Sequence, residues 1–296
     1  MSSKTVANSK TVANPDAAQR GLVTRFIGSR AVYHTIMIGF SIIFVVPMLW
    51  MVMSSFKTKR EIFGSPFSLP KSLDFSVWTE AWERGNLGQY VLNSFFVTFV
   101  SVLAILVCSL FAAYAFSRFE FRFKNVLLGL FVLGLLLPVQ SYLTAQSRLF
   151  DALYILDTRW ALIIPYSGLG LALAVFLLKT YMDSLPKELF EAARMDGAGD
   201  MRILFSVVTP LMVPGIATVA IFSVLATWNE FLLSILYVVD DSLRTIPAGL
   251  LAFTGKYSTD YPTLFAALSI ITIPMIAIYV VFHRQVIAGV TEGSVK

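Results

Sequence analysis

Charged side chains and cysteine are scarce in this chain of 296 residues. Asp, Glu, Lys and Arg make up 14% of it and hydrophobic residues 57%, a balance that excludes an ordinary soluble domain. The only cysteine is Cys108, so the chain cannot form an intrachain disulfide. Alternating polar and apolar strands, which mark an outer-membrane barrel, are also missing. The composition is therefore typical of a helical membrane protein.

Long apolar runs are present instead. A bilayer-crossing helix needs about 20 mostly apolar residues. Six stretches without Asp, Glu, Lys or Arg meet this need: 31–56, 85–117, 125–147, 160–178, 203–229 and 261–282. We therefore predict an all-α integral membrane fold with six transmembrane helices over residues 31–296, preceded by a disordered N-terminal tail over residues 1–30.

The positive charges are unevenly distributed about these six spans. With an even number of spans both termini lie on one side of the membrane, and this side carries 14 of the 23 Lys and Arg residues. The positive-inside rule then places both termini in the cytoplasm. We attribute the net charge of +5 to this topology and to contact with anionic lipid headgroups, and we expect no nucleic acid partner.

A polar insert, the loop 184–210, separates the fourth and fifth spans. Residues 187–195 are good helix formers, and we expect Asp183 and Ser184 to cap this helix while Pro186 occupies its first turn. The helix carries a low-profile apolar stripe rimmed by charges: Leu189, Ala192, Ala193 and Met195. Small side chains permit close approach, so the helix is suited to lie in a groove of a partner protein.

The second half of the insert predicts a sharp turn and another helix. Gly197 and Gly199 can take the left-handed conformation that ends a helix. Asp200 can cap the next helix, which we expect to continue without interruption into the fifth span. Such continuity would make the insert a stiff lever on the membrane helices.

The insert resembles the coupling loop of ABC importer permeases. The pattern of that loop is Glu-Ala-Ala, three residues, Gly, nine residues, and Ile-x-Leu-Pro. The matching residues here are Glu191, Ala192, Ala193, Gly197 and Pro210. Val207 stands in place of the isoleucine and Thr209 in place of the leucine, two departures from the pattern.

Four segments resemble the carbohydrate, maltose-type branch of these permeases. They are 112–118 at the end of the second span, 193–197 in the insert, 227–231 with the sequence Thr-Trp-Asn-Glu-Phe, and the tail 286–296. The likeness spans roughly residues 30–296. It is to the second, six-span permease subunit of such importers.

The resemblance implies a division of labour. The permease would pair with a homologous second permease, two ABC ATPase subunits and an extracytoplasmic solute-binding protein in the bacterial inner membrane. It would translocate a sugar, a di- or oligosaccharide, by alternating access, while ATP and Mg bind to the ATPase subunits. The residues that the resemblance places against an ATPase are Leu189, Glu191, Ala192, Ala193, Met195, Asp196 and Gly197.

The sequence predicts no catalytic or metal site in this chain. It contains no Gly-x-x-x-x-Gly-Lys-Ser/Thr loop, so we expect ATP to be hydrolysed by separate subunits. His34 and His283 lie at the ends of distant spans, and no cluster of His, Cys and carboxylates has metal-ligand spacing. We therefore predict a transporter subunit without a cofactor of its own, and not an enzyme.

Polar groups inside the spans are candidates for the substrate pathway, because lipid contact is costly for them. Trp228, Asn229 and Glu230 lie in the fifth span, and Gln140 follows Pro138 in the third. In one interpretation Asn229 and Glu230 hydrogen-bond sugar hydroxyls while Trp228 stacks on a pyranose face. In the other, these side chains join helices or pair with the partner permease, and Gln140 satisfies a kink.

Three rival functions remain open. An ABC permease for a non-sugar solute (glycerol phosphate, a peptide, an amino acid) would keep the polar insert but lose the other resemblances. An ion-coupled secondary transporter would need an inverted repeat or coupling carboxylates in mid-membrane. An intramembrane enzyme would need paired catalytic side chains at one depth.

Overall fold

The apolar runs of the sequence form helices. The structure, a computed structural model, describes residues 30–255 and 259–292. In those ranges the chain consists of helices and loops without a strand, which confirms the predicted all-α fold. The predicted disordered tail, Arg30 excepted, lies outside the described residues.

Four of these helices are long. They are α2 (Arg30–Ser54), α5 (Leu87–Arg118), α8 (Trp160–Asp183) and α15 (Tyr261–Glu292). Among the described residues, three helices are long and apolar enough to cross a membrane: Val32–Ser54, α5 and α8. A bent pair of helices in the fifth apolar run would make a fourth span. The count of six spans therefore stays a prediction.

The third apolar run, 125–147, does not form the single helix that was predicted for a span. It forms α6 (Lys124–Leu136), the 3₁₀ turn η1 (Val139–Ser141) and α7 (Leu143–Ala152). The break follows from Pro138, because a proline disfavours helical backbone in the residue before it. Leu137 accordingly has an extended backbone conformation and ends α6.

The fifth apolar run is also broken, and the predicted continuous helix from Asp200 into the fifth span is wrong. The run forms α10 (Asp200–Ile203), the π-helical turn η2 (Leu204–Val208), α11 (Thr209–Leu211) and α12 (Val213–Trp228). The chain bends by 77° between Leu211 and Val213. Pro210 and Pro214 on either side of this bend cannot donate a helical hydrogen bond, which explains the break.

Thr209, which departs from the coupling-loop pattern, has a local role in this irregular segment. Its hydroxyl donates a 2.8 Å hydrogen bond to the carbonyl oxygen of Leu204. The same carbonyl also accepts from the Thr209 backbone N–H, in the i to i+5 pattern of a π turn, so the hydroxyl is a second donor to it. The threonine thus stabilises the turn that precedes the bend.

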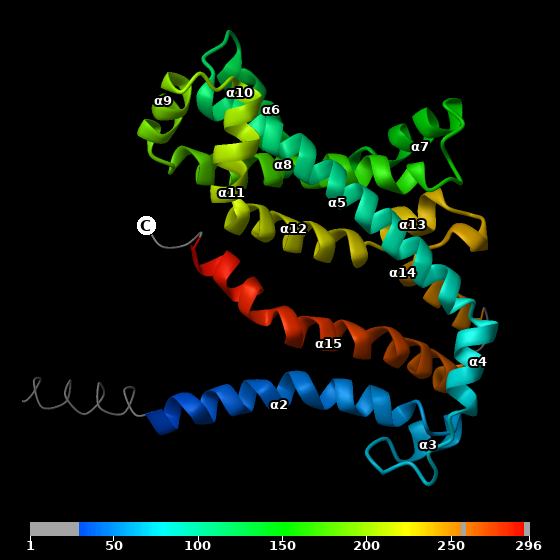
Figure 1. Cartoon of the computed structure of the whole chain (residues 1–296). Coiled ribbons are helices and arrows are strands. Elements are labelled where there is room, and N and C mark those ends of the chain that lie inside the picture. Colours follow the sequence, from blue (N-terminus) through cyan, green and yellow to red (C-terminus); the bar gives the residue numbers. More distant parts are fainter. Residues whose placement is uncertain (1–29, 256–258, 293–296) are drawn as a thin grey trace, which may run out of the picture.

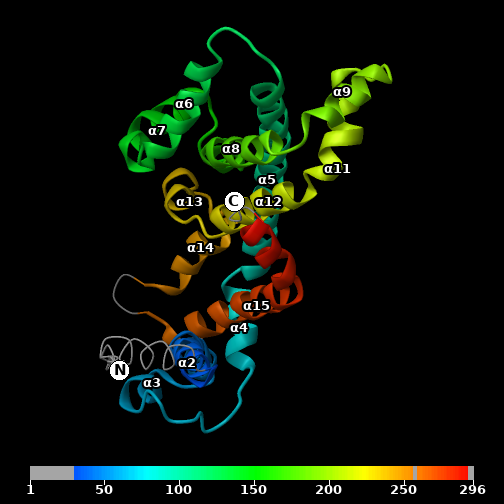
Figure 2. The same cartoon turned by 90° about the vertical axis from the view of Figure 1, so that its left-hand side faces the viewer.

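Short helices lie at the two ends of the long ones. They are α3 (Lys59–Gly64), α4 (Ser76–Arg84), α9 (Lys187–Met195), α13 (Leu232–Tyr237), η3 (Asp241–Leu243), α14 (Ile246–Gly249) and η4 (Leu250–Phe253). Figure 1 shows α9 and α10 at the left-hand end, the side on which α2 also starts, and α3, α4, α13 and α14 at the other end. Figure 2 looks onto the end that carries α9. We call these the α9 end and the α4 end.

The core lies where α5 packs along α8 and α12. Small residues make this approach close: a Cβ on Gly170 of α8 would collide with the side chain of Ile105 on α5. Buried Ser101, Ser109 and Ala113 line the same helix α5. Membrane helices associate through such small residues, because lipid supplies no hydrophobic drive between them.

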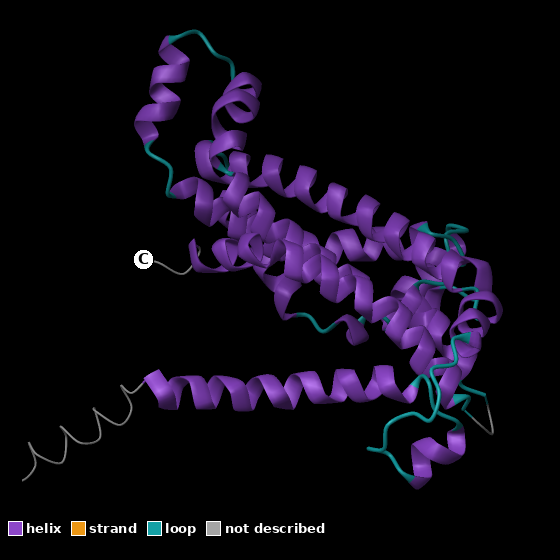
Figure 3. Cartoon of the chain, turned by 60° about the horizontal axis from the view of Figure 1, so that its bottom comes forward, coloured by secondary structure: helices purple, strands orange, loops and turns teal. Residues whose placement is uncertain are grey.

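Helix α2 stands apart from this core. Its described side chains from residue 33 to residue 49 are all exposed in the isolated chain. Figure 3 shows that it approaches the other helices only near its end, where Trp50 meets Phe265 of α15 at 5.3 Å between ring centroids. An apolar helix with so little cover requires lipid or another protein around it.

Candidate functional site

Helix α9 begins at Lys187, directly after Pro186, and the predicted cap by Asp183 and Ser184 is wrong. No side chain caps the first turn of α9. Asp183 instead accepts a 2.6 Å hydrogen bond from Ser117 at the end of α5, and its other oxygen binds Lys179. The Ser184 hydroxyl donates to the carbonyl of Tyr181. The carboxylate therefore joins α8 to α5, which leaves it unable to cap α9.

The turn after α9 depends on one glycine. Gly197 has a φ of +80°, which confirms the predicted left-handed end of the helix. Gly199 does not share this role, because its backbone is extended. Asp200 is the first residue of α10 and does not cap it, since its carboxylate accepts from Arg194 at 3.1 Å and from the Tyr114 hydroxyl at 3.4 Å.

The residues that were predicted to couple to an ATPase mostly lie on the open side of α9. Met195 is 88% exposed and Leu189 is 39% exposed. The other exposed members are Glu191, Ala192, Asp196 and Gly197. Ala193 is half-buried and packs on the core instead. The structure thus brings six of the seven residues to one accessible knob, which we call the α9 knob.

Phe190, which the sequence reasoning missed, holds this knob on the bundle. Its side chain is 7% exposed and packs in the core cluster with Met182 and Ile203. The guanidinium carbon of Arg118, the last residue of α5, lies 3.4 Å from the centre of the Phe190 ring. Nη2 of Arg118 also donates a 2.7 Å hydrogen bond to the Met182 carbonyl. The spacing of Phe190 three residues before Ala193 was the available signal.

Of the predicted pathway residues, Glu230 joins separate helices through its side-chain hydrogen bonds. Its carboxylate accepts a 2.7 Å hydrogen bond from the Tyr166 hydroxyl on α8. Both carboxylate oxygens also accept from the Leu233 backbone N–H, at 3.0 and 3.1 Å. Glu230 therefore caps the short helix α13 and joins it to α8, across the break between α12 and α13.

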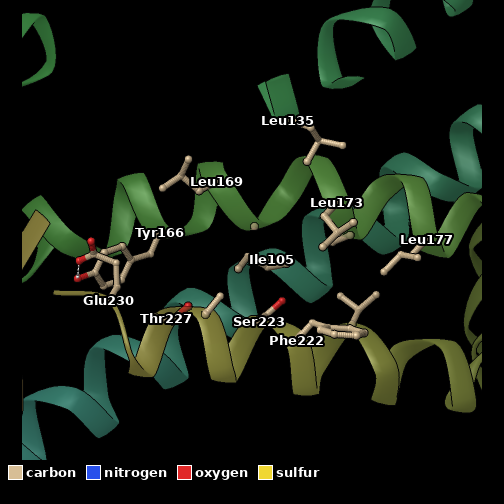
Figure 4. Close-up of a pocket in the computed structure, with 14 residues that line it drawn as sticks. Ile105, Leu135, Tyr166, Leu169, Leu173, Leu177, Phe222, Ser223, Thr227 and Glu230 are labelled. Atoms are coloured by element: carbon tan, nitrogen blue, oxygen red, sulfur yellow. Dashed lines mark hydrogen bonds between the residues drawn. The ribbon is translucent and has the colours of Figure 1, made fainter. Parts of the chain in front are cut away.

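A cavity of about 270 Å³ lies beside this carboxylate, between α8 and α12. Figure 4 shows Tyr166 and Glu230 together at one end, with leucines of α8 on one wall and Phe222 of α12 on the other. Its polar side chains are Tyr166, Ser223, Thr227 and Glu230. The remaining lining is apolar, so the polar groups run from the Glu230 end to Ser223 near the middle of the cavity, as Figure 4 shows.

The other predicted pathway residues do not line this cavity. Trp228 packs among residues of α4, α14 and α15. The Asn229 side-chain amide donates a 2.8 Å hydrogen bond to the Leu225 carbonyl at the end of α12. Gln140 lies exposed on η1. Tyr166, which reasoning from the sequence did not single out, is the residue that the fold places against Glu230.

At the α4 end, the loop 238–246 is fastened to α5. Asn93, 1% exposed, donates from its amide to the carbonyls of Ser242 (2.7 Å) and Arg244 (3.0 Å). Its carbonyl oxygen accepts from Nη2 of Arg159, which precedes α8, at 3.1 Å. The loop is ordered internally as well, because the Ser242 N–H donates to Asp240 and lowers the pKa of that carboxyl below its usual value.

Two more residues of α5 hold the same loop. The Tyr90 hydroxyl donates a 2.8 Å hydrogen bond to Asp241, and Oγ of Ser94 accepts one of the same length from the Ile246 N–H. Within residues 30–255 and 259–292, no group of three His, Cys, Asp or Glu side chains is arranged to hold a metal ion. The sites described above can form hydrogen bonds and can dock a partner protein.

Comparison with known proteins identifies the family. Residues 105–291 match the family described as the inner membrane component of binding-protein-dependent transport systems. The chain belongs to this family. It is therefore an ABC importer permease, a transporter component of the inner membrane and not an enzyme. The family implies ATPase and solute-binding partners.

Relatives match this permease over most of its length. The diacetylchitobiose uptake system permease protein NgcG of Streptomyces coelicolor is 36% identical and covers 90% of this chain and 89% of its own. The galactooligosaccharides transport system permease protein GanQ of Bacillus subtilis is 31% identical, with 93% and 98% covered. The trehalose transport system permease protein SugB of Mycobacterium tuberculosis is 30% identical, with 90% and 96% covered.

A solved structure shows the same fold. It is a chain in the crystal structure of a bacterial ABC transporter involved in the import of the acidic polysaccharide alginate. The TM-score is 0.75 at 21% sequence identity, with 93% of this permease and 99% of that chain covered. At this identity the likeness concerns the fold alone.

Proposed function

We propose that this permease is one of two membrane subunits of an ATP-driven importer that translocates a di- or oligosaccharide by alternating access. Relatives at 30–36% identity are named for diacetylchitobiose, trehalose and galactooligosaccharides, which supports a sugar substrate. The start of α2, the end of α15 and α9 lie at one end of the bundle, which agrees with cytoplasmic termini and a cytoplasmic coupling loop.

The observation that carries the proposal is the α9 knob. A folded polar helix projects from the bundle, fixed on one side by Phe190 and free on the other. The flexible side chain of Met195 is 88% exposed at its tip, and exposed Ala192 leaves room for close approach. These features suit insertion into a cleft of an ATPase subunit. In this proposal ATP and Mg bind to the ATPase pair, and the permease needs no cofactor.

The exposed apolar surface of this chain supports a homologous second permease as a partner in this proposal. The side chains of α2 from residue 33 to residue 49 and most of those on α6 are uncovered in this chain. Lipid can cover part of such a surface. A second permease also shares the substrate pathway, which matters because the cavity at Glu230 is largely apolar. We assign most sugar contacts to the partner permease. The main role that we assign to Glu230 is to hold α8, α12 and α13 together.

Site-directed crosslinking of the assembled importer tests the knob. Cys108 is replaced by Ala, Met195→Cys is introduced, and the complex is treated with a thiol-to-amine crosslinker. We expect a permease–ATPase product that depends on Met195→Cys. Leu69→Cys, at a position that is 77% exposed at the α4 end, serves as the control and should give none. Full reaction of Met195→Cys with a bulky maleimide in the assembled complex, without an ATPase crosslink, would contradict the proposal.

The substrate class is tested by uptake into proteoliposomes that contain the importer and its solute-binding protein. Labelled diacetylchitobiose, trehalose and a galactooligosaccharide are compared with glycerol phosphate, a peptide and an amino acid. We expect ATP-dependent uptake of one of the sugars. Uptake of a non-sugar alone would contradict the sugar assignment and leave the permease assignment intact.

A further inference from the structure

Helix α5 connects the two ends of the molecule without a break. It has 32 residues, which at about 1.5 Å per residue make a rod of about 48 Å. Its sequence contains no proline, and its one glycine, Gly88, is the second residue. Kinks in helices arise mainly at prolines, glycines and π turns, so α5 has no built-in hinge along its length.

The segment that follows α9 in sequence is less suited than α5 to transmit a displacement of α9. The chain from α10 to α12 includes the π turn η2 and a bend of 77°. If α9 were displaced, this segment would flex at the bend between Leu211 and Val213 and would transmit little of the displacement. A stiff connection between α9 and the far end of the molecule therefore requires a helix that contacts α9 without following it in sequence.

At the α9 end, two contacts fasten α9 and α10 to α5. The Arg118 guanidinium lies over the ring of Phe190, and Arg118 also donates to the Met182 carbonyl. Four residues earlier in α5, Tyr114 donates to Asp200, which also accepts from Arg194 of α9. Arg118 is partly buried, and the attraction of a cation to an aromatic face grows as water is removed from around it.

At the α4 end, the same helix holds the loop 238–246 through its first two turns. Asn93, Tyr90 and Ser94 supply four hydrogen bonds to this loop, at 2.7–3.0 Å. Asp157 adds a link from the loop before α8, because its carboxylate accepts from the Val239 and Asp240 N–H groups at 2.8 Å. One rigid helix is thus bonded to α9 at one end and to an exposed loop at the other.

We propose that α5 transmits the movement of α9 to the loop 238–246, with Arg118 and Tyr90 as positioning residues at its two ends. This rests on the proposed function, in which an ATPase moves α9. ATP can shift the membrane helices only if the ATPase state favours one arrangement of them. Because α5 is stiff and is bonded at both ends, it carries this preference across the membrane. The nucleotide state of the ATPase at the α9 end would then bias the conformation of the loop 238–246 at the α4 end.

The contact at the α9 end is tested by a double-mutant cycle in the reconstituted importer. Arg118→Gln removes the cation while keeping a side-chain donor, and Phe190→Leu removes the ring while keeping an apolar side chain. We expect each to lower uptake per ATP hydrolysed by about tenfold. The double variant should be no worse than either single variant, and Phe190→Tyr should keep the ring contact and retain uptake.

Arg122→Gln is the matched control for this cycle. Arg122 also lies over an aromatic ring, at 5.0 Å from the centre of Phe123, but the two residues are neighbours in sequence and join no separate elements. Uptake per ATP should therefore be unchanged in this variant. An equal loss in Arg122→Gln would mean a general effect of lost charge and would overturn the assignment of Arg118.

The contact at the α4 end is tested by Tyr90→Phe, which removes only the hydroxyl that binds Asp241. We expect stimulation of ATP hydrolysis by the solute-binding protein to fall by about tenfold, while thermal stability of the complex changes little. Tyr154→Phe is the control, because Tyr154 is exposed and lies beyond α5. A structural role alone would lower stability and leave the stimulation factor unchanged.

The outcomes separate this inference from the proposed function. Each variant also carries Met195→Cys in the Cys108→Ala background, and its crosslink to the ATPase is measured. Intact crosslinking with lost coupling in Arg118→Gln and Tyr90→Phe supports α5 as the transmitting helix. Intact crosslinking with full coupling in both variants overturns the role of α5 and remains consistent with docking of the α9 knob on the ATPase. Absent crosslinking without any further substitution contradicts the proposed function itself.

Discussion

The Tyr166 hydroxyl donates a 2.7 Å hydrogen bond to the Glu230 carboxylate, across 64 positions of sequence. This bond crosses from α8 to the break between α12 and α13, where the carboxylate also caps α13. An acidic side chain within an apolar run is costly in a membrane unless such partners are present. The pair therefore accounts for a carboxylate that the sequence alone leaves unexplained.

Replacing Glu230 should affect stability before it affects recognition. Glu230→Ala leaves the Leu233 N–H and the Tyr166 hydroxyl without their acceptor, which we expect to cost about 1–3 kcal/mol for each group. Glu230→Gln keeps an acceptor oxygen and should cost less. Thermal unfolding of the purified complex and sugar uptake are measured side by side for both variants.

Tyr166→Phe serves as the companion variant because it removes only the hydroxyl. If Glu230 acts through α8, Tyr166→Phe and Glu230→Gln should lower the unfolding temperature with little change in uptake by the complex that remains folded. Normal stability of Glu230→Gln together with abolished uptake would instead assign the carboxylate to the sugar.

Gly197 should tolerate asparagine better than valine. Its φ of +80° costs an L-residue roughly 1–2 kcal/mol, and asparagine bears this cost better than a β-branched residue. A Cβ here meets no atom within 4 Å beyond the neighbouring residues, so backbone strain and the fit to the proposed ATPase partner, not internal crowding, should decide the effect. We expect Gly197→Val to abolish uptake at normal expression and Gly197→Asn to retain a part of it.

Gly199→Ala provides the control for this turn. Gly199 has a negative φ, and a Cβ there also meets nothing within 4 Å, so uptake should be close to normal. Equal loss of uptake in Gly199→Ala and Gly197→Val would show that any change in the loop is harmful, and that the left-handed backbone is not the cause.

Gly170 should be intolerant of any larger residue. A Cβ at this position collides with the Ile105 side chain, so Gly170→Val forces α5 and α8 apart at an overpacking cost of about 1–3 kcal/mol. Ile105→Ala in the same chain should recover part of the loss. The measurement is the unfolding temperature of the purified complex.

Gly168→Ala tests whether position or composition matters on the same helix. A Cβ at Gly168 has no neighbour within 4 Å, so this variant should unfold at the normal temperature. A large loss in Gly168→Ala, or none in Gly170→Val, would contradict the packing of α5 on α8 described above.

Local properties of the sequence were sufficient for several features of this permease. The apolar runs predict helices, because a backbone in lipid must satisfy its own hydrogen bonds. The left-handed turn at Gly197 follows from the one residue type that takes this conformation freely. The spacing of Glu191, Ala192, Ala193 and Gly197 predicts the family, which the comparison confirms.

Where the sequence reasoning failed, a local preference yielded to a contact or to a proline. Asp183 was expected at the cap of α9, but a serine and a lysine on other turns bind it first. The lever from Asp200 into the fifth span was expected to be straight, although Pro210 and Pro214 were visible in the sequence. Pro138 likewise divides the third run. The average apolar character of a run hides such single residues.

The sequence by itself determined the helical class, the family and the turn that ends α9, because these depend on residues a few positions apart. Only the tertiary structure decided that Arg118 lies over Phe190, that Tyr166 reaches Glu230, and that Tyr90 holds Asp241 across 151 positions. Such pairs form when packed helices bring distant side chains within reach. No periodicity or spacing along the chain encodes them, since each depends on how the helices pack together.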